Sequence, residues 1–202
     1  MRIFILVVCG VMLAAQHANA QRPQRTALTP SERAVEVALS DEALQFRYRS
    51  DGSIVNVKQG RLYAGLFVSE DRDVVGSAAL LVPIDVPLGK RLSLQLGPQA
   101  YMALLSDEEN SDVLALALGA ELRFALLSER QIELVGSGYY SPDVITFGSA
   151  DNLFDLEARI EARLTERAVG ILGARWFELD LTTGDERTLQ DELFLGVRVG
   201  LR

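Results

Sequence analysis

Charged residues alternate with aliphatic residues along several parts of the chain, and this spacing limits the chemistry they could perform. Glu157, Arg159, Glu161 and Arg163 occupy every second position of one such stretch. Side chains two residues apart share one face of a strand, so acids and bases spaced in this way can form ion pairs with one another. The charged residues that we expect to face one shared interior are Glu121, Arg123, Glu133, Glu157, Arg159, Glu161, Arg163, Arg175 and Arg198.

Side chains that titrate near neutral pH are almost missing from the chain. Residues 1–20 have the features of a cleaved secretory signal peptide: Arg2, an apolar stretch over 3–15 and an Ala-x-Ala ending. The only Cys and the only His, Cys9 and His17, lie within that segment. Ser–His and Cys–His catalysis and imidazole or thiolate metal sites are then excluded in the exported protein. We therefore expect no catalytic residue, no metal site and no cofactor, and we predict that the protein is not an enzyme.

The composition limits the class of protein. The chain has 202 residues, 49% of them hydrophobic, and a formal net charge of −8. This length suits one domain, and the acidic balance argues against nucleic-acid binding. No apolar run reaches the roughly 20 residues that a transmembrane helix needs. We assign residues 21–31, which are polar and rich in Pro, to a flexible lead-in and residues 32–202 to the folded domain.

Apolar residues recur with period two beyond the lead-in, which predicts strands with one apolar face. The first two segments are the least certain, because residues 30–32 could instead cap a helix through Leu39; without this pair the strand count is eight. The ten predicted strands lie near residues 33–39, 42–49, 60–69, 73–82, 91–105, 112–125, 131–140, 153–165, 168–180 and 191–202.

Three architectures are compatible with these strands. They are a soluble sandwich, a soluble lipocalin-like barrel with its apolar face inward, and an antiparallel transmembrane β-barrel with that face outward. Long strands whose polar faces are rich in Gly, Gln, Glu and Arg favour the transmembrane barrel, as do longer or more acidic links at the end opposite the chain termini. In that barrel we place four aromatic residues at the outer membrane interface: Tyr139, Tyr140, Trp176 and Phe177.

Short segments of the chain resemble the YfaZ family of Gram-negative outer-membrane proteins. The resemblance begins at Tyr139–Ile145 (YYSPDVI) and continues through Ala115–Phe124, Leu153–Leu164, Gly170–Phe177 and Gly196–Leu201. It implies an outer-membrane barrel, and it brings no biochemical activity that could be transferred to named residues.

The sequence therefore predicts a non-catalytic outer-membrane barrel with a narrow, charge-filled lumen. Such a barrel would contribute to envelope structure or pass very small solutes. Its expected partners are outer-membrane lipids, lipopolysaccharide and the outer-membrane assembly machinery. The alternative is a soluble periplasmic lipocalin-like barrel that binds an apolar ligand.

Overall fold

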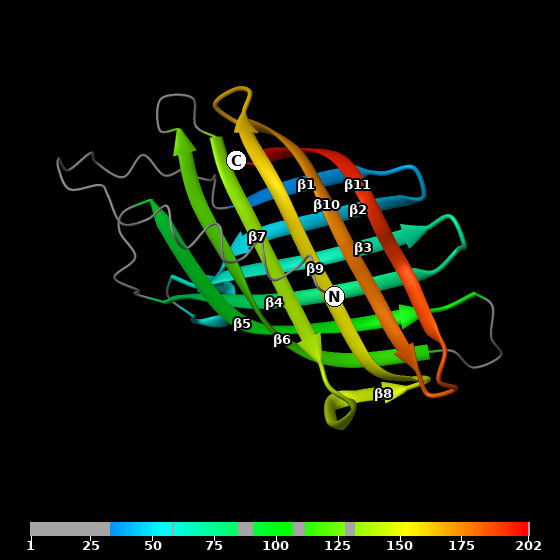
Figure 1. Ribbon diagram of the computed structural model, residues 1–202. Coiled ribbons are helices and arrows are strands. Elements are labelled where there is room, and N and C mark those ends of the chain that lie inside the picture. The colour runs from blue at the N-terminus through cyan, green and yellow to red at the C-terminus, as the bar shows by residue number, and fades with distance from the viewer. Residues whose placement is uncertain (1–32, 58, 85–90, 107–111, 128–131, 202) are drawn as a thin grey trace, which may run out of the picture.

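The computed structural model describes residues 33–57, 59–84, 91–106, 112–127 and 132–201, and these residues form one antiparallel sheet (Figure 1). The signal peptide expected over 1–20 and the lead-in expected over 21–31 lie outside this part of the chain. The strands are β1 (Arg33–Leu39), β2 (Ala43–Asp51), β3 (Arg61–Ser69), β4 (Val74–Ile84), β5 (Leu92–Leu104), β6 (Asp112–Leu127), β7 (Ile132–Ser141), β8 (Thr146–Gly148), β9 (Ala150–Arg163), β10 (Ala168–Leu181) and β11 (Glu186–Leu201).

The sheet closes into a barrel of ten long strands. Each strand pairs with the next along the chain, and β1 pairs with β11 from Arg33↔Leu201 to Leu39↔Leu195. The short β8 is not counted as an eleventh strand of the barrel wall, because it pairs with β6 beyond the end of β7. The ten-strand prediction is confirmed, and the first two segments form strands rather than a helix. Short 3-10 turns follow β2 (Gly52–Val55) and β7 (Asp143–Ile145).

No helix within the described part of the chain is long and apolar enough to cross a membrane.

The strands present apolar side chains to the outside of the barrel. Leu114, Leu116 and Leu118 of β6 and Leu193 and Leu195 of β11 are all exposed on this outer face. Charged and polar side chains alternate with them and point inward, where they are buried. This orientation is the opposite of that in a lipocalin-like barrel, whose apolar face lines the interior.

Two strands begin earlier than the periodicity predicts. β9 begins at Ala150 and β11 at Glu186, rather than near residues 153 and 191. The added residues include Asp151, Glu186 and Thr188, so they lack the alternation of apolar residues from which strands were predicted. The earlier start of β11 leaves only residues 182–185 between β10 and β11, fewer than the gap between the predicted strands 168–180 and 191–202.

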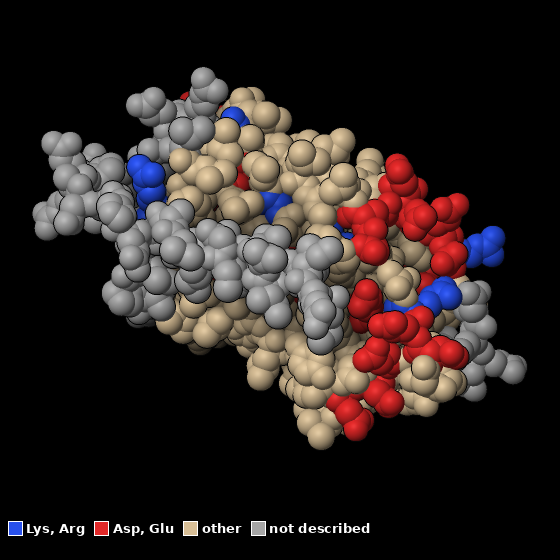
Figure 2. Space-filling view, in the orientation of Figure 1, with Lys and Arg blue, Asp and Glu red and all other residues tan. Residues whose placement is uncertain are grey.

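The two ends of the barrel differ in charge. We call the end at which β1 begins and β11 ends the terminal end, and the opposite end the far end. Figure 2 shows acidic side chains gathered at the far end. The exposed acids of the strand ends and links there are Asp41, Glu42, Glu70, Asp71, Asp112, Asp143, Asp180, Asp185, Glu186 and Asp191.

Candidate functional site

The interior of the barrel is crossed by ion pairs, and Glu161 of β9 forms ion pairs with three arginines. Its carboxylate is fully buried and contacts Arg123 of β6 at 3.1 Å, Arg159 of its own strand at 2.9 Å and Arg198 of β11 at 2.9 Å. These residues face inward because the residues that alternate with them along each strand are apolar and face outward. One acid thus links three strands across the lumen.

Two further acids extend this network toward β1 and β2. Arg47 of β2 contacts Glu36 of β1 at 3.2 Å and Glu157 of β9 at 2.8 Å. Glu36 also lies 3.5 Å from Arg198, and Glu157 is hydrogen-bonded to Arg159. Buried charges are tolerated when they are paired and hydrogen-bonded in this way. The barrel is therefore braced from β1 to β9 by side chains as well as by its backbone.

The acid on β6 completes the network. Glu121 contacts Arg123 at 2.7 Å and accepts a hydrogen bond of 3.4 Å from the hydroxyl of Tyr63 on β3. Arg61 at the start of β3 lies farther from Glu121, at 3.8 Å, and Arg123 reaches Glu133 of β7 at 3.3 Å.

A second kind of contact lies between this network and the far end. Arg175 of β10 forms two hydrogen bonds of 2.9 Å to Asp155 of β9, and the Tyr101 hydroxyl donates to the same carboxylate at 2.7 Å. The Arg175 guanidinium also lies over the rings of Phe67 and Phe177, 5.2 and 4.4 Å from their centroids. Such cation–π contacts join the charged layer of the lumen to an apolar one.

Apolar side chains fill the lumen toward the far end, and we call this layer the apolar plug. The Phe177 ring packs edge-on against Phe67 at 5.9 Å and tilted against Tyr101 at 5.7 Å. The members of the plug include Phe67, Val75, Tyr101, Val113, Leu153, Phe177 and Leu179.

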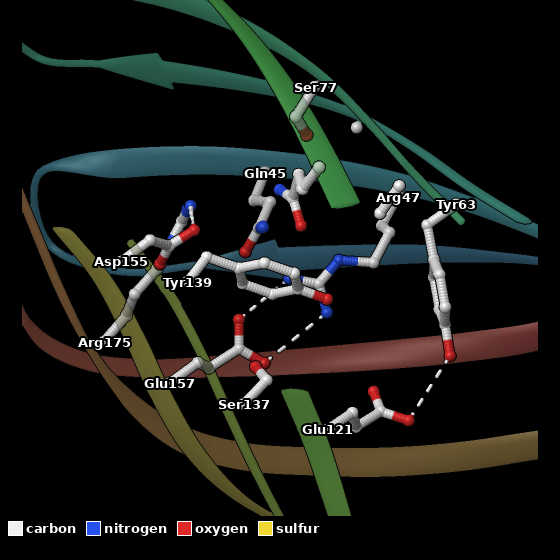
Figure 3. Close-up of a pocket in the computed structure, with 13 residues that line it drawn as sticks. Gln45, Arg47, Tyr63, Ser77, Glu121, Ser137, Tyr139, Asp155, Glu157 and Arg175 are labelled. Carbon is white, nitrogen blue, oxygen red and sulfur yellow. Dashed lines mark hydrogen bonds and ion pairs between the residues drawn. The ribbon is translucent and has the colours of Figure 1, made fainter. Parts of the chain in front are cut away.

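A small polar cavity remains inside the barrel, between the network and the plug (Figure 3). Its volume is about 40 Å³, which is room for about three water molecules. Arg47, Tyr63, Glu157 and Arg175 line it, and Nη1 of Arg175 is buried there with no hydrogen-bond partner. Water in the cavity would satisfy this donor.

The structure places most of the expected charged residues in this interior. Glu133 and Arg163 are only half-buried, the latter at the terminal end of β9. The fully buried ones are Glu121, Arg123, Glu157, Arg159, Glu161, Arg175 and Arg198.

The structure corrects the placement of two of the four aromatic residues. Tyr140 faces outward and is 50% exposed, and Trp176 is half-buried on the same outer face of the sheet. Tyr139 and Phe177 face inward instead, Tyr139 beside the cavity and Phe177 in the plug. The inward orientation of Phe177 follows from the alternation of side chains along a strand, because Phe177 is two residues from the inward-facing Arg175.

Sequence reasoning missed several residues that the structure places in the interior contacts. Glu36 and Arg47 lie on the two least certain strands, and Asp155 and Tyr101 were not singled out. The signal for Asp155 was available, because it lies two residues before Glu157 and shares its face. No group of three or more His, Cys, Asp or Glu in the described part of the chain could hold a metal ion.

Comparison with known proteins gives a match to a sequence family and matches to solved structures. A family model described as "YfaZ precursor" matches residues 36–201, which include parts of all eleven strands. No curated protein sequence matches the chain. A solved structure described as a bacterial polysaccharide outer membrane secretin is similar, with 12% sequence identity and a TM-score of 0.47. That match covers 79% of this chain, which spans only 56% of the other.

Proposed function

Because this chain belongs to the YfaZ family, we propose that it is a non-catalytic integral outer-membrane β-barrel protein. Its closed, charge-filled lumen would make it a structural component of the envelope. The observation that carries this proposal is the direction of the side chains, apolar outward and ion-paired inward. That direction is the one a barrel needs in lipid, where outward charges are costly and inward ones can be paired.

The outer face supports a lipid environment. Leucine and valine side chains stand exposed around the barrel on β6, β10 and β11, with Leu118 and Leu195 among the most exposed. Soluble monomers rarely expose apolar patches larger than a few hundred Å². We propose lipids and lipopolysaccharide as the partners of this face, and the outer-membrane assembly machinery as the partner during insertion.

The interior favours structure over transport. A solute would have to pass both the ion pairs around Glu161 and the apolar plug around Phe177. Passage of very small solutes is the second candidate function, because the cavity beside Arg175 can hold a few water molecules. Neither reading requires a catalytic group.

The first test is the mobility of the protein on SDS gels with and without boiling. A folded outer-membrane barrel resists SDS because every backbone group is paired within its closed sheet. We expect unboiled protein from the outer-membrane fraction to migrate differently from boiled protein. Recovery in the soluble periplasmic fraction, with no mobility shift, would contradict the proposal.

Conductance in planar lipid bilayers separates the two candidate functions. Purified, gel-shifted protein should insert without opening ion channels if the lumen is structural. Stable unitary currents from the wild-type protein would favour passage of small solutes instead.

A further inference from the structure

Arg49 of β2 is a buried cation with no acidic partner among the residues that the structure describes. Its side chain faces the lumen, and the residue is only 6% exposed. Arg47 lies two positions before Arg49 on the same face of β2, and it contacts both Glu36 and Glu157. No carboxylate within the described ranges forms an ion pair with Arg49. This makes Arg49 an exception in an interior where the other buried arginines are paired.

Arg49 has like charges around it. Arg198, Arg123 and Arg61 all act on it electrostatically as like charges. Tyr63, whose hydroxyl reaches Glu121, is the residue paired with Arg49 on β3. Arg49 and the three arginines that act on it come from β2, β3, β6 and β11. We call them the arginine cluster: Arg49, Arg61, Arg123 and Arg198.

The arginine cluster keeps unused hydrogen-bond donors, although Arg123 and Arg198 also pair with Glu161. Nη2 of Arg123 and Nη1 of Arg61 are buried and make no hydrogen bond. Arg61 has only a distant ion pair to Glu121, at 3.8 Å. Burying an unpaired cation costs far more than burying a paired one, and unsatisfied donors add to that cost. A bound anion would remove both penalties at one point.

We propose that the arginine cluster is a binding site for a phosphate group at the terminal end of the lumen. Guanidinium groups present planar pairs of donors that match the oxygens of phosphate, and several of them can share one ion. The cluster lies near the first residues of β1 and β3, and Arg61 keeps 29% of its side chain exposed there. A small ion, or the phosphate of a lipid headgroup, can therefore reach the donors from that end. The inference goes beyond the structural role proposed above and does not depend on it.

The test compares phosphate with chloride on the refolded full chain in alkyl maltoside micelles, which contain no phosphate. Thermal unfolding is followed by the fluorescence of Trp176, the single Trp of the chain, at matched ionic strength. We expect phosphate to raise the unfolding temperature of the wild type more than chloride does. Arg49→Gln should weaken the apparent phosphate affinity by about tenfold or more, which corresponds to the loss of one charge-assisted hydrogen bond.

Two further variants make the result specific. Arg49→Lys keeps the charge but removes the planar donors, so its phosphate response should fall between those of wild type and Arg49→Gln. Arg167→Gln removes an exposed cation at the same end of the barrel and should behave as wild type. If Arg49→Gln does not fold, as judged by the gel shift, the Arg49→Lys comparison and ³¹P line broadening of the wild type remain decisive.

The source of the phosphate is resolved by a second titration with short-chain phosphatidylglycerol. An Arg49-dependent rise in unfolding temperature with this lipid, and none with inorganic phosphate, would identify the ligand as a lipid headgroup. Equal effects of phosphate and chloride with no lipid effect, or a full phosphate response in Arg49→Gln, would overturn the proposal. The gel shift of the same samples reports on the barrel itself, so the two proposals can fail separately.

Discussion

Arg187 of β11 reaches across the far end of the barrel to Asp73, the residue before β4. Its Nε and Nη2 both donate to the same carboxylate oxygen, at 3.2 and 3.0 Å. β4 and β11 are not neighbours in the sheet, so the contact joins opposite sides of the wall. Asp73 is 1% exposed and also accepts a hydrogen bond of 2.9 Å from the backbone N–H of Ser106. This bridge holds the rim together beside the apolar plug.

Removal of the bridge should destabilise the far end. In Asp73→Asn, Arg187 and the Ser106 N–H lose a charged, buried acceptor, and we expect a loss of about 2 kcal/mol in the free energy of unfolding. Urea titration of the folded barrel in detergent measures this loss. Asp71→Asn is the matched control, because the Asp71 side chain is 71% exposed and lies 3.7 Å from Arg187; it should cost less than about 1 kcal/mol. Equal losses in both variants would contradict this role for Asp73.

The central acid of the lumen should matter more than an acid at its edge. Glu161→Gln leaves Arg123, Arg159 and Arg198 without a shared buried carboxylate, so we expect a loss of about 3 kcal/mol or failure to fold. Glu133→Gln removes a single contact of 3.3 Å to Arg123 from a half-buried position. It should cost less than about 1 kcal/mol. The temperature at which unboiled protein loses its gel shift gives both values in rank order.

A charge on the outer face distinguishes a membrane barrel from a soluble one. Leu172 faces outward near the middle of β10, between Ile160 and Leu195 of the neighbouring strands. In lipid, Leu172→Arg should cost about 2–4 kcal/mol and reduce insertion into vesicles. Val144→Arg, at an exposed rim position, should have little effect. If Leu172→Arg instead increases the yield of soluble, folded protein, the outer face does not contact lipid.

Replacing large side chains of the apolar plug with smaller ones should open the lumen to ions if the plug is what closes it. The double variant Phe67→Ala, Phe177→Ala removes two packed rings that also lie against the Arg175 guanidinium. We expect measurable bilayer currents from this variant and none from the wild type, at a stability cost of several kcal/mol. Leu193→Ala shortens an exposed outer side chain and should leave the bilayer silent. If the double variant still folds, as judged by its gel shift, but gives no bilayer current, the barrier to ions lies in the ion-pair network instead.

The strands and the inward charges were predictable because a charge can face only one side of such a wall. The alternation over 153–165 places Glu157, Arg159 and Glu161 together whatever the exact barrel. Apolar residues carry no such constraint, because they are compatible with both lipid and a packed interior. Phe177 was therefore placed outside on its residue type, although its spacing from Arg175 places it inside. The plug as a whole could not be predicted for the same reason.

Two other features could not be predicted from the alternation of side chains along the strands: the irregular pairing of β10 with β11 and the surroundings of Arg49. The pairing of β10 with β11 shifts at Phe177/Glu178, so Leu189 and Gln190 are both buried although they are adjacent. A simple alternation cannot place two neighbours on one face. The lack of a described acidic partner for Arg49 was equally hidden, because the partners of the lumen arginines come from strands on other sides of the barrel.

The contact between β1 and β11 has a consequence for how the protein is made. Its first pair, Arg33↔Leu201, joins residues from opposite ends of the described chain. The other strands can pair with their neighbours in the sequence as these become available. The pairing of β1 with β11, which we call the seam, can form only after the last strand is available. Pairings of such high contact order are slow to form. Until the seam closes, β1 and β11 are two unsatisfied edges, and we expect a chaperone or a catalyst of insertion to cover them.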